Sequence, residues 1–173
     1  MMEPVVQLLR RQLQDGLPDL DGAEAAATIP ISDRLLSQAI VAGIPNGAPV
    51  KDVLLRAEEN DRIALKITLA RPSFLPPIPV SLAIHEQPTL PGNPTLTLRI
   101  SQSAALVAMA ERALKHAPLP AGVSIAGDRI HVDIHTLLAT RNLEYLLPYL
   151  TELNVHTRAG AVVLSLRARV KRA

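Results

Sequence analysis

The segment HVDIH at residues 131–135 carries two histidines with an aspartate between them. In a strand, alternate residues share a face, so all three polar side chains would project to one side. At a rise of ~3.3 Å per residue the two imidazoles would lie ~13 Å apart, too far for one zinc ion whose ligands sit ~2 Å away. A metal site here would need Asp133 together with His85 or His156 from a neighbouring strand. Otherwise the segment forms a polar outer face.

Other catalytic signals are sparse. His85 and Glu86 are an acid–base pair in type, but adjacent strand residues point to opposite faces. The chain has no glycine-rich phosphate loop, Gly-x-Ser-x-Gly elbow or His-Glu-x-x-His helix, and its lack of cysteine excludes disulfides and thiolate sites. We therefore predict that the protein is not an enzyme and uses no cofactor or metal. An enzyme built on His131, Asp133 and a distant partner is the least favoured alternative.

Composition points to an aliphatic interior. Hydrophobic residues make up 48% of the 173 residues, but aromatic residues only 2%. Leu, Ile, Val and Ala must therefore fill the core. Because single-stranded nucleic acids are bound largely by stacking on aromatic rings, we predict no nucleic-acid partner.

Basic residues gather near the C-terminus, although the formal net charge is only +2. Arg167, Arg169 and Lys171 alternate along an expected strand, so they share one face. This face is either simply solvated or a contact for an anionic membrane surface or polymer.

The clearest structural signal is alternation in residues 62–71, RIALKITLAR, where apolar and polar or small residues alternate. This period of two is typical of a strand with one buried and one wet face. The pattern returns around residues 80–84, 96–100, 130–134 and 164–170. It predicts an antiparallel sheet with one continuous aliphatic face. The inward residues expected to line a ligand site are Ile63, Leu65, Ile67, Leu69, Leu96, Leu98, Ile100, Val132, Ile134, Leu164 and Leu166.

Helical patterns are short. Apolar spacing and capping residues predict helices over 3–14, from Ser32-Asp33 to Gly43, over 104–115 and over 136–147, with a break at Pro148. We therefore predict an α+β fold, a curved antiparallel sheet with three or four short helices packed on its apolar face. Residues 1–22 would form an N-terminal amphipathic helix and turn, and residues 23–173 a single α+β domain.

Hairpin signals complete the pattern. Turns at 59–61, 127–128 and 159–160 each separate two alternating segments. Prolines flank the strand at 80–85 and place those flanks at edges or bulges. The order strand, helix, hairpin occurs once around residues 29–67 and again around 132–166, so an internal repeat is one interpretation and reuse of a common motif is the other.

The arrangement resembles the tubular lipid-binding superfamily, which includes bactericidal/permeability-increasing-like proteins and small bacterial relatives. The matching parts are the strand and helix at 27–40, the hairpin at 53–69, the proline-flanked strand at 80–88 and the closing unit at 129–170. The resemblance implies a strongly curved sheet that wraps a helix and encloses an apolar channel for lipid.

Three functional hypotheses follow. The favoured one is non-enzymatic binding of a lipid or other apolar ligand, such as an acyl chain, in a groove between sheet and helices. The alternative is a structural or protein–protein interaction module with a fully packed core, in which an exposed edge or the basic strand contacts a partner or a second copy. The third is the enzyme described above.

Targeting signals are not evident. The arginines at positions 10 and 11 follow the first apolar residues, whereas a signal peptide carries its positive charges before them. No apolar run reaches the length that spans a bilayer. As written, the chain is predicted to be soluble and cytoplasmic, or exported if a leader has been removed.

Overall fold

The computed structural model describes residue 11 and residues 21–71, 74, 76–101, 119 and 121–170. These residues form nine strands and three short helices, and strands hold more than half of them. The strands make two antiparallel sheets. The expected α+β fold, one curved sheet with three or four helices on its apolar face, is therefore wrong, because the described chain is predominantly β. The helices expected over 104–115 and, apart from residue 11, over 3–14 lie outside the described residues.

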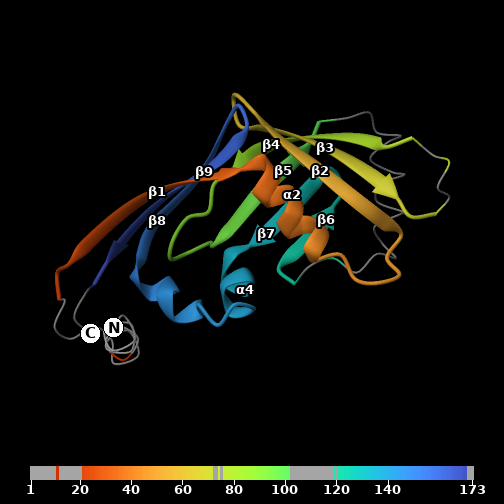
Figure 1. Ribbon diagram of the computed structural model, residues 1–173. Helices are drawn as coiled ribbons and strands as arrows, with labels where there is room; N and C mark the ends of the chain where they lie inside the picture. The colour runs from red at the N-terminus through yellow and green to blue at the C-terminus, as the bar shows by residue number, and fades with distance from the viewer. Residues whose placement is uncertain are drawn as a thin grey trace, which may run out of the picture.

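The smaller sheet has three strands in the order β1-β9-β8. They are β1 (Glu24–Ser32), β8 (Leu150–Arg158) and β9 (Ala161–Arg169). Figure 1 shows these long strands running together away from the rest of the molecule, with β1 along the outside. This sheet therefore joins the beginning of the described chain to its end.

The larger sheet has six strands in the order β2-β3-β4-β5-β7-β6. All neighbouring strands are antiparallel. Their bounds are β2 (Val50–Glu58), β3 (Arg62–Leu69), β4 (Ile78–Glu86), β5 (Thr95–Ile100), β6 (Val123–Ala126) and β7 (Arg129–Asp133).

The predicted hairpins are present, and their turns use residues that tolerate positive φ. Asn60 and Asp61 lie at φ 60° and 58° between β2 and β3, while Gly127 and Gly160 take positive φ in the other two hairpins. Asn, Asp and Gly reach this region with the least steric penalty. The local turn chemistry thus brings together the two strands of each hairpin.

Helix α2 (Asp33–Ala42) packs beside the edge of the larger sheet. Ser32 caps it by accepting a hydrogen bond from the Leu35 N–H. The Ser37 hydroxyl accepts a hydrogen bond from the Leu55 N–H of β2 at 2.8 Å and lies 3.3 Å from the Leu55 carbonyl oxygen. A buried serine thus satisfies main-chain groups of an edge strand, and this contact places α2 against β2 (Figure 1).

The other two helices replace one long expected helix. The strand expected to reach His135 ends at Asp133, which caps α4 (Ile134–Ala139). A 3₁₀ helix, η2 (Glu144–Tyr149), then contains Pro148. Proline has no backbone N–H and so cannot donate an α-helical hydrogen bond. The tighter 3₁₀ helix accommodates it.

The two strand–helix–hairpin units cross between the sheets in opposite directions. The first begins with β1 in the smaller sheet, passes through α2 and ends with the β2–β3 hairpin in the larger sheet. The second begins with β7 in the larger sheet, passes through α4 and η2 and ends with the β8–β9 hairpin in the smaller sheet. The chain therefore connects the two sheets through both units.

Candidate functional site

One face of the larger sheet is aliphatic across its whole width. Leu55 of β2 lies opposite Leu65 of β3, and Leu98 of β5 lies opposite both Ile84 of β4 and Ile130 of β7. Directly opposed residues of an antiparallel pair project to the same face. The members of this face are Val53, Leu55, Ala57, Ile63, Leu65, Ile67, Ile78, Val80, Leu82, Ile84, Leu96, Leu98, Ile100, Val123, Ile125, Ile130 and Val132.

The smaller sheet has an equivalent face. Leu164 of β9 lies between Ile29 of β1 and Val155 of β8. One step further along β9, the neighbours of Leu166 are Ala27 and Leu153. The arginines and glutamates of these strands lie on the opposite face, among polar and small residues. The members of the apolar face are Ala25, Ala27, Ile29, Ile31, Leu153, Val155, Val162, Leu164, Leu166 and Ala168.

The two faces meet in a single hydrophobic cluster. Val155 and Val162 of the smaller sheet pack in the same buried cluster as Leu55 and Leu82 of the larger sheet. Leu36 of α2 packs against this cluster from the side. We call the two faces together with the Leu36 side of α2 the inner apolar surface.

Much of the inner apolar surface is incompletely covered. Ile29 is 43% exposed, and Ile40, one helical turn beyond Leu36, is 38% exposed. Leu65, Leu98 and Ile130 are only half-buried. Among the described residues, no large side chain is fully buried. The surface therefore combines an aliphatic core with an apolar margin that water reaches.

Most of the predicted ligand-lining residues lie on this surface, but in two sheets. Leu164 and Leu166 belong to the smaller sheet and the others in strands to the larger sheet. Ile134 does not share the face of Val132, because it begins α4. Leu69 ends β3 beyond a register irregularity and stands opposite Val50. Ile29 and Ile40 were not predicted as site residues, although both occur in patterns typical of half-buried elements.

The two arginines near the end of β9, the strand predicted to present a basic face, are both paired with glutamates. Arg167 Nε lies 3.3 Å from a Glu152 carboxylate oxygen, and Arg169 lies 2.7 Å from Glu24. Both arginines also line a depression of about 400 Å³ at the far end of the smaller sheet. Lys171 lies outside the described residues. Anionic contact by this strand stays a prediction, and any anion would have to compete with these ion pairs.

The histidine-rich segment is divided between two elements. His131 lies on β7, 3.3 Å from the Thr97 hydroxyl, whereas His135 lies on α4. His85 and Glu86 approach to 3.8 Å at a β-bulge, where strict alternation fails. Among the described residues, no three His, Asp or Glu side chains are grouped so that they could hold a metal ion.

Asp133 has a structural task at the start of α4. The Thr136 hydroxyl donates to its carboxylate at 2.8 Å, and the Thr136 N–H donates at 3.3 Å. These hydrogen bonds, the side-chain one foremost, lower the pKa of Asp133 below its ordinary value against the opposing effect of burial. A negatively charged acceptor at a helix N-terminus also interacts favourably with the positive end of the helix dipole.

Replacing Asp133 by alanine is expected to lower the free energy of unfolding by about 1 kcal/mol at neutral pH. Asp133→Asn keeps a cap and should lose less. Because the folded-state pKa is depressed, the carboxylate's contribution is present above the unfolded pKa of ~3.9 and is lost as the pH falls through the folded pKa. Urea unfolding at neutral pH and near pH ~3 tests this. If Asp133→Ala lowers the free energy of unfolding by the same amount at both pH values, the prediction is wrong.

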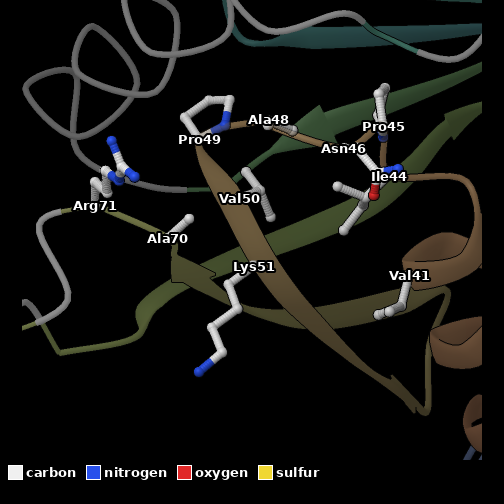
Figure 2. Close-up of a pocket in the computed structure, with 11 residues that line it drawn as sticks. Val41, Ile44, Pro45, Asn46, Ala48, Pro49, Val50, Lys51, Ala70 and Arg71 are labelled. Atoms are coloured by element: carbon white, nitrogen blue, oxygen red, sulfur yellow. The ribbon is translucent and has the colours of Figure 1, made fainter.

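A separate open pocket of about 750 Å³ lies where β2 begins and β3 has ended. Its apolar lining comes from Val41, Ile44 and the proline-rich loop before β2. Figure 2 shows Lys51 and Arg71 at this pocket with their charged ends pointing in different directions. These two cations do not converge on one point, so the pocket lacks the focused polar group that usually orients a bound small molecule.

Comparison with protein-family models, curated proteins and solved structures finds no match to this chain. In the part of the chain that the structure describes, none of the helices has the length and apolar character needed to cross a membrane.

Proposed function

We propose that the protein binds an acyl chain or a similar apolar ligand on the inner apolar surface, without catalysis. The supporting observation is the continuity of that surface across both sheets, together with its exposed margin at Ile29 and Ile40. An exposed aliphatic margin beside a core is unfavourable in water and is typical of a surface that receives an apolar partner.

The chemistry of the surface suits a flexible hydrocarbon. It offers aliphatic contacts from the alternate residues of two sheets, and its strands carry their charges on the opposite faces. Burial of each methylene contributes ~0.8 kcal/mol. About ten methylenes would contribute ~8 kcal/mol before the entropic cost of binding, which limits affinity to roughly micromolar or weaker. Long chains should therefore bind, and short-chain acids should not.

Native mass spectrometry of protein purified from cells without detergent tests this proposal. The expected spectrum contains a bound mass of lipid size that disappears after extraction with organic solvent. A bare protein mass, together with no uptake of an added long-chain fatty acid, would overturn it. That outcome would favour an interaction module whose apolar surface is closed by protein.

A further inference from the structure

Three of the four edge strands of the two sheets are protected from pairing with another strand. On β2, Ser37 bonds Leu55, and the Gly160 N–H donates to the Ala57 carbonyl at 2.9 Å. On β8, the side chain of Gln87 bonds both main-chain groups of Val155. The remaining edge of the larger sheet, β6, has only four residues. Caps and very short edge strands both prevent pairing with another chain.

The fourth edge, β1, has neither protection. It is nine residues long, and all of them except Ile31 are exposed. Its single charged residue, Glu24, is already paired with Arg169. Figure 1 shows β1 on the outer side of the smaller sheet. A long exposed edge strand with few charges is a template for another strand.

The backbone geometry identifies which main-chain groups face outward. The Asp33 N–H donates to Gly160, and the Ala23 carbonyl accepts from the Val170 N–H, so odd-numbered residues direct their hydrogen bonds toward β9 and its flanks. Even-numbered residues therefore face the open side. Pro30 fits this parity, because a proline within a sheet turns its nitrogen to the unpaired side. Glu24, Ala26 and Thr28 then each present a donor and an acceptor, which have no partner among the described residues.

We propose that β1 pairs antiparallel with β1 of a second copy of this chain, centred on Ala26. In this register Ala26 faces Ala26 of the second copy, and Glu24 faces Thr28. Each of these outward residues exchanges both main-chain hydrogen bonds with the residue that it faces. The Thr28 hydroxyl opposes a carboxylate that it can donate to, and the flanking alanines are small. Two three-stranded sheets join into one continuous sheet.

Two other symmetric registers centred on an outward-facing residue of β1 are less favourable. Centring on Thr28 places Ala26 opposite Pro30, which has no N–H to donate. Centring on Glu24 places two carboxylates opposite each other, which is destabilising. Of these three registers, the sequence of β1 therefore favours the one centred on Ala26.

Cysteine cross-linking tests the register, because the chain has no native cysteine. Residues in a hydrogen-bonded antiparallel pair have Cα atoms ~5.5 Å apart, within the range for a disulfide. Ala26→Cys should form a covalent dimer as the main product of mild oxidation. Ala25→Cys and Ala27→Cys should each form no covalent dimer alone, but they should cross-link when mixed, because these two positions face each other across the proposed dimer. Ala26→Cys that links no faster than Ala25→Cys would overturn the proposal.

Sedimentation of the unmodified chain and of Ala26→Pro gives a second readout. The Ala26 nitrogen faces away from β9, so proline removes only an outward donor, as Pro30 already does. The unmodified chain should be dimeric and Ala26→Pro monomeric, with unchanged circular dichroism. A monomeric unmodified chain throughout its soluble concentration range would overturn the proposal and leave β1 for a different partner.

Discussion

Replacing Gln87 by alanine is expected to lower the free energy of unfolding by about 2 kcal/mol. The Gln87 amide donates to the Val155 carbonyl at 2.7 Å and accepts from the Val155 N–H at 2.9 Å. Val155 is 6% exposed, so water cannot easily replace these bonds, and a buried main-chain group left without a partner costs about 1–3 kcal/mol. Urea unfolding followed by circular dichroism measures the loss.

Gln38→Ala supplies the matched control for this change. Gln38 is exposed on α2, and its replacement should alter stability by less than about 0.5 kcal/mol. Gln87→Glu should also destabilise, because a carboxylate can accept from the Val155 N–H but repels the Val155 carbonyl. Equal stability of the Gln87→Ala and Gln38→Ala proteins would show that Gln87 does not couple the sheets.

The importance of Gln87 lies in where it connects. It follows β4 of the larger sheet and bonds β8 of the smaller one. Asp61, in the β2–β3 turn, makes a second such link by accepting from the Thr157 N–H at 3.0 Å. These side chains extend the hydrogen bonding of one sheet onto the edge of the other. They hold the two aliphatic faces in register around their common cluster.

Alternation in the sequence predicts the strands and their inward residues well, because side chains along a strand change face at every residue. The same alternation cannot divide strands between sheets. Leu98 and Leu164 have equivalent neighbours in the sequence, but they belong to different sheets, since β9 pairs with β1 across more than a hundred residues. Such pairing depends on contacts far apart in the chain, which no local pattern contains.

The position of α2 and the start of α4 are also not predicted by the sequence pattern, because single polar side chains determine them. Ser37 interrupts the apolar pattern of α2 and carries no obvious signal, but its hydroxyl attaches the helix to the edge of β2 rather than to the apolar face. Asp133 has strand neighbours in the sequence, but its carboxylate ends β7 by capping α4. Capping competes with strand extension whenever a following turn can form. For these positions, tertiary and capping contacts override the simple period.

Replacing Ile29 and Ile40 together by glutamine is expected to weaken long-chain fatty-acid binding by about 30-fold, from roughly 1 kcal/mol of lost apolar contact at each site. This prediction depends on the proposed function. Both side chains are already partly exposed at 43% and 38%, so the folded state should tolerate the changes. A fluorescent fatty acid, titrated into protein from which bound lipid has been extracted, measures the affinity.

Leu54→Gln is the control that separates a binding surface from general hydrophobicity. Leu54 is 52% exposed, and it lies on β2 beside Leu55, so its side chain projects from the opposite, outer face of the larger sheet. Leu54→Gln removes a similarly accessible aliphatic side chain and leaves the inner apolar surface unchanged. The affinity for the fatty acid should therefore not change. If both variants weaken binding equally, the probe adheres wherever aliphatic groups are exposed. If neither does, the ligand lies elsewhere, and the exposed margin at Ile29 and Ile40 serves another contact.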